Sequence, residues 1–161
     1  MTTSSTQKQN ADCPYRIIDD LAQLGEKNII LTSHMYQENA KELANRNDAA
    51  LLIKSDQEVQ DVSLYLGGIP LILLDFPHFS DGRAYSKAVQ LRQEYKFEGE
   101  IRAYGDVRQD QLLEMQRCGF DSYVLAQTEV KYFLSKSAKN FSHQYQASIL
   151  NPNPLFRSRS A

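Results

Sequence analysis

Five short apolar segments recur along the chain, and stretches with helical periodicity or helix-capping residues separate them. They span residues 28–33, 49–54, 67–76, 98–106 and 121–127. Strands that alternate with helices at intervals of about 20 to 30 residues are typical of βα units, which build a parallel sheet. The run LILL in the third segment also fits a strand that is covered on both faces. We therefore predict an α/β fold of about five βα units with a mostly parallel sheet, and a last helix from about Thr128.

Two architectures satisfy this pattern, an open doubly wound sheet and a partial barrel. A closed barrel of eight βα units usually needs about 200 residues or more, and this chain has 161. Each crossover should be right-handed. In either architecture a ligand binds beyond the carboxyl ends of the strands, so the loops at that edge are the place to seek a site.

The two ends of the chain differ in composition from the middle. Residues 1–13 are rich in Ser, Thr, Gln and Asn, which predicts a disordered leader. Residues 151–161 contain two prolines and end in a basic, serine-rich run, which is typical of a flexible tail. The alternative for this tail is a docking peptide formed by Leu155, Phe156, Arg157 and Arg159. Residues 14–150 are then expected to form a single α/β domain.

Charge, hydropathy and cysteine content exclude several classes of protein. The net charge of -2 provides no positive field that would recruit nucleic acid or anionic lipid. No apolar run approaches the roughly 18 to 20 residues of a membrane span. The two cysteines, Cys13 and Cys118, lie far apart, which argues against a zinc site and a disulfide framework. We expect a cytoplasmic protein with neither nucleic acid nor membrane as a partner.

Common motifs for phosphate binding, dinucleotide binding and a serine nucleophile are missing from the sequence. It contains no G-x-x-x-x-G-K-[ST], no G-x-G-x-x-G and no G-x-S-x-G pattern. Its three histidines are scattered, so the sequence predicts no metal and no other cofactor. Cys118 falls at the carboxyl end of a predicted helix, where the helix dipole disfavours a thiolate, and we expect a packed residue there.

The loops that follow the third and fourth apolar segments contain the most polar side chains. Some of them have expected structural roles: Ser80 or Asp81 can cap the next helix, and Asp106 can cap the one after it. Phe76 and Phe79 are expected to seal the loop onto the core. Inside the fourth segment, Arg102 needs a carboxylate partner, because an unpaired buried charge is very costly. Its candidate partners are Asp75, Asp81 and Asp106.

These charged residues support two hypotheses. In the first, Arg83 and Arg102 hold an anion such as phosphate, sulfite or a carboxylate, and His78 can act as a general acid or base beside Asp81. In the second, they form a structural ion-pair network and His78 is a solvated loop residue. The candidate ligand-binding residues are His78, Asp81, Arg83, Arg102 and Asp106. No catalytic residue is assigned.

Three segments also carry a family resemblance: FPHFSDGRAYSKAVQLR, FEGEIRAYGDVRQDQLLEMQRCGFDSYVL and FSHQYQ. They resemble the bacterial domain of unknown function 934 family, closely over residues 68–146 and loosely before them. Members are commonly encoded beside assimilatory sulfite reductase and are often labelled oxidoreductases of sulfite reduction. The family offers no established catalytic residues. Many members are expected to have a lysine at the position of His78.

Two functions of different classes remain. The resemblance implies an accessory factor in assimilatory sulfite reduction, with sulfite reductase as its partner, and this role is preferred. The residues also allow a small enzyme or sensor that binds an oxyanion or phosphorylated ligand at the carboxyl ends of the third and fourth strands. Because the sequence has no flavin or nicotinamide motif and no cysteine pair, it does not favour a redox enzyme that acts alone. Whether the protein is an enzyme stays open.

Overall fold

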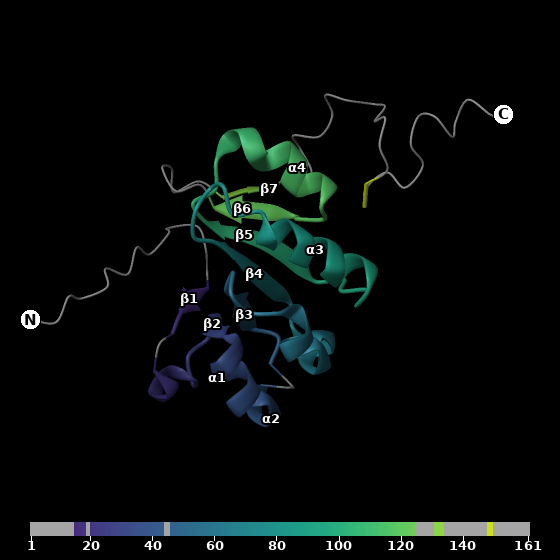
Figure 1. The fold of residues 1–161 in the computed structure, drawn as a ribbon. Coiled ribbons are helices and arrows are strands. Elements are labelled where there is room, and N and C mark those ends of the chain that lie inside the picture. The colour runs from purple at the N-terminus through teal and green to yellow at the C-terminus, as the bar shows by residue number, and fades with distance from the viewer. Residues whose placement is uncertain (1–14, 19, 44–45, 125–130, 134–147, 150–161) are drawn as a thin grey trace, which may run out of the picture.

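The computed structural model describes residues 15–18, 20–43, 46–124, 131–133 and 148–149. These residues form one sheet of seven strands, which lie in the order β1 to β7 (Figure 1). Strands β1 to β6 run parallel, and β7 pairs with β6 in the antiparallel direction. The predicted leader and tail lie outside the described residues.

The strands and helices alternate as the apolar pattern predicts. The strands are β1 (Arg16–Ile17), β2 (Ile29–Thr32), β3 (Ala49–Ile53), β4 (Leu71–Phe76), β5 (Glu100–Gly105), β6 (Ser122–Val124) and β7 (Lys131–Phe133). The α-helices are α1 (Ser33–Glu38), α2 (Ala40–Leu43), α3 (Arg83–Gln93) and α4 (Leu112–Arg117). Three 3₁₀-helical segments are η1 (Leu21–Gln23), η2 (Val59–Gly68) and η3 (Gln109–Gln111).

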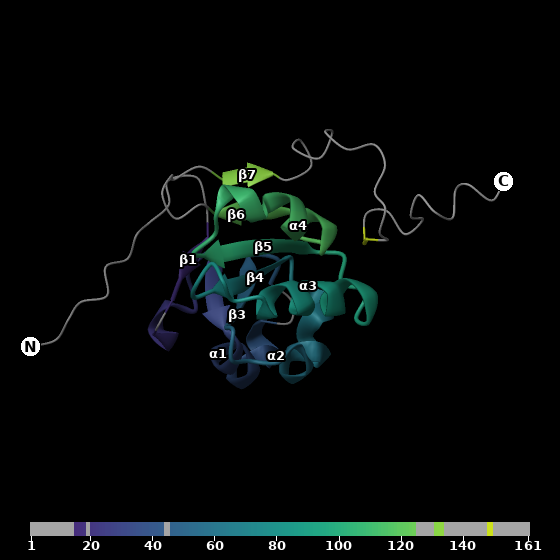
Figure 2. The ribbon, with the colours of Figure 1, turned by 45° about the horizontal axis from the view of Figure 1, so that its top comes forward.

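The sequential strand order distinguishes between the two predicted architectures. Each connection between parallel strands leads to the next strand along the sheet, always in the same direction. If all these connections have the same handedness, their helices lie on one face of the sheet. The parallel sheet curls into a half-barrel (Figure 2). The prediction of an α/β fold is confirmed, and its partial-barrel form is the one that the chain adopts.

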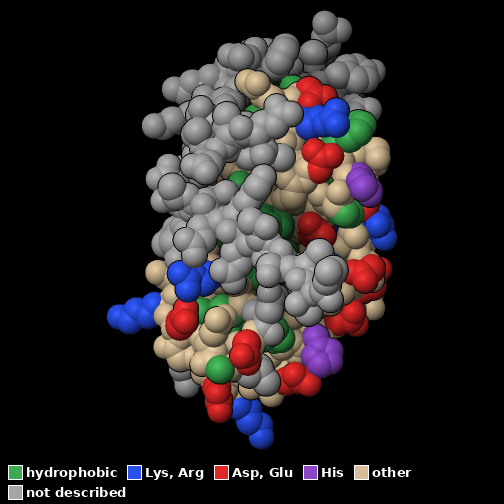
Figure 3. All heavy atoms as spheres, turned by 90° about the vertical axis from the view of Figure 1, so that its left-hand side faces the viewer, with side chains coloured by type: hydrophobic (Ala, Val, Ile, Leu, Met, Phe, Trp, Pro, Cys, Tyr) green, Lys and Arg blue, Asp and Glu red, His purple; other side chains and the backbone are tan. Residues whose placement is uncertain are grey.

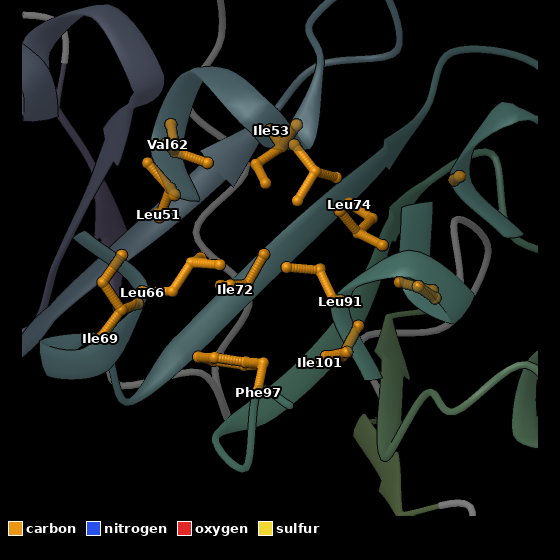
Figure 4. Close-up of a cluster of buried hydrophobic side chains, with 14 of the residues drawn as sticks. Leu51, Ile53, Val62, Leu66, Ile69, Ile72, Leu74, Leu91, Phe97 and Ile101 are labelled. Atoms are coloured by element: carbon orange, nitrogen blue, oxygen red, sulfur yellow. The ribbon is translucent and has the colours of Figure 1, made fainter. Parts of the chain in front are cut away.

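The main hydrophobic core lies between the sheet and the helices (Figure 4). Strand side chains that alternate toward the helices include those of Leu51, Ile53, Ile72, Leu74 and Ile101. They pack against Val62 and Leu66 of η2 and Leu91 of α3. All of these side chains are buried, so each helix is fixed to the sheet by the apolar stripe that its periodicity creates.

The other face of the sheet, which we call the inner face, carries a second and smaller cluster. Its buried members are Ile30, Ala50, Leu52, Leu71 and Leu73. The buried residues of this cluster all come from strands, whereas the main core takes side chains from α1, α2, α3, α4 and η2. Because side chains alternate along a strand, the residues that follow in the same phase also belong to the inner face.

Two sequence expectations about the elements differ from the structure. The third strand begins at Leu71 instead of residue 67, because η2 continues to Gly68 and Pro70 precedes the strand. The predicted helix from about Thr128 is wrong for 131–133, where β7 pairs with the free edge of β6. Aromatic residues such as Tyr132 and Phe133 favour strands, and the open edge supplies the hydrogen bonds.

Candidate functional site

The loop between β4 and α3 is built around the pair Asp81 and Arg83. Arg83 Nη2 lies 2.6 Å from Asp81 Oδ2, and Arg83 Nε lies 3.0 Å from Asp81 Oδ1. The backbone N–H of Arg83, the first residue of α3, also donates to Asp81 Oδ1 at 3.1 Å, although the N-cap position of the helix is Gly82. These hydrogen bonds lower the pKa of Asp81 to about 2. The Arg83 guanidinium also reaches Ser55 Oγ at 3.3 Å, which ties the loop to the end of β3.

Lys87 of α3 adds a second link to the same edge. Its side chain is buried, and its ammonium donates to the carbonyl oxygens of Lys54 and Ser55 at 2.8 and 2.9 Å. Burial lowers the pKa of Lys87, because a low-polarity environment disfavours the charged form. The carboxyl end of β3 is therefore held by two cationic side chains from α3.

Asp106 holds the neighbouring part of this loop. Its Oδ2 accepts the backbone N–H of Phe79 at 3.0 Å, and Gln111 Nε2 donates to the Phe79 carbonyl at 2.6 Å. The expected cap by Asp106 is wrong, since the residue directly before η3 is Arg108, whose backbone N–H donates to Gln111 Oε1 at 3.1 Å. Phe79 is 45% exposed and does not seal the loop, whereas Phe76 is buried as expected. The Arg108 guanidinium carbon lies 3.6 Å from the Phe79 ring centroid.

Arg102 projects from the inner face and is buried. Its Nη2 lies 2.7 Å from Glu100 Oε1, and its Nε donates to Ser122 Oγ at 3.0 Å. None of the three expected partners, Asp75, Asp81 and Asp106, accepts a hydrogen bond from Arg102 among the described contacts. The sequence analysis missed Glu100 as the partner of Arg102. Strand alternation could have indicated it, because residues 100 and 102 are two apart on one strand and share a face.

The structure therefore places the five predicted site residues in different surroundings. Asp81 and Arg83 form an ion pair in the β4–α3 loop, Asp106 fixes Phe79, and Arg102 pairs with Glu100 on the inner face. His78 is exposed, and its carbonyl accepts the backbone N–H of Asp81 at 2.9 Å. No described hydrogen bond or ion pair joins all of them into one site.

A different set of polar side chains meets at the carboxyl edge of the inner face. Asp75 of β4 is opposite Tyr104 of β5 in the parallel ladder. Ile53 is opposite Leu74, so Lys54, one residue further, is level with Asp75. All three positions continue the inner-face alternation of their strands. We call Lys54, Asp75 and Tyr104 the inner row. Strand alternation is the signal that could have identified it, once the helix-covered face was known.

The charges around Asp75 are consistent with this geometry. Its pKa is raised mainly by burial; Lys54 opposes the shift, Asp81 and Asp56 add to it, and Lys87 also opposes it. Burial also raises the pKa of Tyr104, and the Asp75 carboxylate adds to that shift. Lys54 is exposed, while Asp75 and Tyr104 are half-buried. Among the described residues, no carboxylate forms an ion pair with the Lys54 ammonium.

The surface at this edge is chemically mixed. The carboxyl end of β5 points to the left in Figure 2. Figure 3 shows the molecule from this left-hand side. Acidic, basic and histidine side chains are spread over the coloured part of this face, and hydrophobic side chains are visible between them. A polar ligand can therefore find both charges and apolar contacts here.

Burial raises the pKa of the Cys118 thiol to about 11, which agrees with a packed cysteine and not with a thiolate nucleophile. In the part of the chain that the structure describes, no three His, Cys, Asp or Glu side chains are grouped so that they could hold a metal ion. No helix among the described residues has the length and apolar character to cross a membrane.

The fold and this edge define an α/β half-barrel protein with ionisable side chains at the carboxyl ends of its central strands. The chain belongs to the family described as "Bacterial protein of unknown function (DUF934)", whose model matches residues 50–156. The resemblance seen in the sequence is thereby confirmed. A search of curated proteins and a search of solved structures found no significant match.

Proposed function

We propose that this protein is an accessory factor in assimilatory sulfite reduction, and so in sulfur assimilation and cysteine biosynthesis. Its membership of the family supports this role, because the resemblance implies a gene position beside sulfite reductase. The proposed action is direct binding to the reductase, which would help to assemble or stabilise that enzyme. The structural observation that carries this part of the proposal is the exposed ring of Phe79.

Phe79 has the properties of an anchor residue in a protein interface. Aromatic and arginine side chains supply most of the binding energy at such interfaces, and Arg108 stacks on this ring. Asp106 and Gln111 hold the backbone N–H and carbonyl of Phe79. An anchor that is already fixed loses little conformational freedom on binding. We call Phe79 and Arg108 the docking pair.

The proposal is tested by copurification with a matched control. Wild-type protein should retain sulfite reductase from a cell extract, and Phe79→Ala should lose most of it. Leu64→Ala is the control, because Leu64 is 90% exposed on η2 and is not part of the docking pair. Equal retention by the wild type and Phe79→Ala would contradict the docking pair.

A growth experiment tests the accessory role itself. A deletion strain should fail to grow with sulfate as sulfur source and should recover with cysteine. The Phe79→Ala gene should not restore growth on sulfate, whereas the Leu64→Ala gene should. Growth of the deletion strain on sulfate with undiminished reductase activity would rule out the accessory role.

The inner row favours a second candidate function, a small enzyme or sensor that binds an oxyanion or phosphorylated ligand. The ligand would bind at the carboxyl ends of β4 and β5, the edge that parallel α/β proteins use for ligands. Lys54 supplies a positive charge there, and the Arg83 guanidinium lies nearby through its contact with Ser55. Titration calorimetry with sulfite and with phosphate tests this function, and the absence of binding at every pH would refute it.

A further inference from the structure

We propose that Lys54, Asp75 and Tyr104 form a binding site for a small oxyanion that carries a proton, such as hydrogen sulfite or hydrogen phosphate. In this site the proton lies between the anion and the Asp75 carboxylate. The inference rests on the second function proposed above and names the residues and the ligand class. It also predicts that sulfate, which carries no proton near neutral pH, binds poorly.

The shape of the inner row suits one small ligand. Neighbouring strands lie about 4.8 Å apart, so the outer two residues of the row are about 10 Å apart at the backbone. The short side chain of Asp75 lies between the longer side chains of Lys54 and Tyr104. A small anion above Asp75 can therefore contact both neighbours at once.

The hydrogen-bonding groups of the row are complementary to such an anion. The Lys54 ammonium and the Tyr104 hydroxyl are donors, and the raised pKa of Tyr104 keeps its proton in place at neutral pH. An ionised aspartate only accepts hydrogen bonds. It therefore repels an anion without a proton, and it accepts a hydrogen bond from the hydroxyl of an anion that has one.

Proton sharing at Asp75 also fits the charges around it. The groups that act on this carboxyl are Lys54, Asp56, Asp81 and Lys87, and Tyr104 faces it from β5. Burial and the two other carboxylates disfavour a negative charge on Asp75. When both free sulfite and Asp75 have lost their protons, binding must take up one proton from the solvent; this forms one O–H bond, and no other bond forms or breaks.

The experiment compares sulfite, phosphate and sulfate by calorimetry between pH 6 and 8, in buffers with different heats of ionisation. Wild-type protein should bind sulfite and phosphate at least about tenfold more tightly than sulfate, which corresponds to about 1.4 kcal/mol. Toward pH 8, where free sulfite has lost its proton, sulfite binding should weaken and should take up close to one proton per anion. Phosphate still carries a proton at this pH, so its binding should need no such uptake.

Two variants isolate the role of the Asp75 carboxylate. Asp75→Asn replaces an acceptor with a neutral group that also donates, so the discrimination against sulfate and the proton uptake should both disappear. Asp56→Asn removes a charge that also acts on Asp75 but lies outside the row, and it should keep both properties. Lys54→Gln and Tyr104→Phe should each weaken binding while the circular dichroism spectrum stays that of the wild type.

The possible failures separate the two proposals. If the wild type binds none of the three anions at any pH, the second proposed function is refuted. If it binds anions with equal affinity for sulfate and without proton uptake, that function stands and the shared proton at Asp75 is refuted. Unchanged binding in folded Lys54→Gln and Tyr104→Phe would place the anion site outside the inner row.

Discussion

Arg102 and Glu100 project from the same face of β5, and the arginine Nη2 lies 2.7 Å from the glutamate Oε1. The Arg102 side chain is only 1% exposed, and Ser122 of β6 accepts another of its hydrogen bonds. A buried guanidinium with these partners fixes β5 to β6. We therefore assign Arg102 a structural role, in line with the second of the two hypotheses drawn from the sequence.

Removing Glu100 should destabilise the protein strongly. Glu100→Ala takes the nearby carboxylate from a buried guanidinium, and breaking such a pair costs about 3–5 kcal/mol. A double variant, Glu100→Leu with Arg102→Met, removes both charges and should recover much of this loss. Urea denaturation measures the free energy of unfolding of each variant. A Glu100→Ala protein as stable as the wild type would show that the pair contributes little.

Gly105 should not tolerate a side chain. Its φ is +104°, and an added Cβ would lie 2.3 Å from the Phe76 carbonyl oxygen, which is part of the adjacent strand backbone. Gly105→Ala should lower the free energy of unfolding by about 1–3 kcal/mol from backbone strain, before the steric overlap is counted. Gly67→Ala is the control, because no atom lies within 4 Å of the added Cβ there. Comparable stability of these two alanine variants in thermal denaturation would contradict the prediction.

Asp75→Asn should stabilise the folded protein at neutral pH. The pKa of Asp75 is raised in the folded state, so the unfolded chain gives up this proton at lower pH than the folded chain. Ionised Asp75 therefore costs stability above its folded pKa, and the cost vanishes below the ordinary aspartate value of about 3.9.

Urea denaturation at pH 7, 5 and 3.5 tests this dependence. The advantage of Asp75→Asn over the wild type should be largest at pH 7 and absent at pH 3.5. A wild type that is more stable than Asp75→Asn at pH 7 would show that the carboxylate is structural. A stability cost at this position is what a functional carboxyl group would produce.

Asp81 should show the opposite pH dependence. Its pKa is lowered to about 2, so its ionised form contributes stability above the ordinary aspartate value. That contribution is lost as the pH falls from about 4 through about 2. Asp81→Asn keeps a side-chain oxygen that can accept the Arg83 N–H but loses the charge, so its stability deficit at pH 7 should shrink over this range. A deficit that stays constant between pH 7 and pH 2 would exclude the ion pair with Arg83 as its cause.

Local patterns were sufficient for most of the fold. The apolar runs that became β2, β3, β4 and β5 are recognisable because buried strands need continuous hydrophobic residues. Gly119 also follows a local pattern, because glycine commonly ends a helix in the left-handed conformation, and it has a φ of +99° just after α4. Strand β1 was missed because its two residues form too short a run to show periodicity.

The candidate site was harder to predict than the fold. The residue types at the carboxyl edge could be read from the loops, and Asp81 does accept a backbone N–H at the start of α3. Which of these side chains lie together could not be predicted from the sequence, because it depends on which face of each strand the helices cover. Arg102 thus lies with Glu100, two residues away on the same strand, and not with the loop carboxylates.

The sequence by itself determined the βα rhythm, the family and the edge where polar residues collect, since each of these follows from short-range patterns. Only the tertiary structure decided that the sheet is a half-barrel and that Lys54, Asp75 and Tyr104 share one row. The reason is that strand order and register are set by backbone hydrogen bonds between segments about 20 to 30 residues apart, and a one-residue shift would move every side chain to the other face.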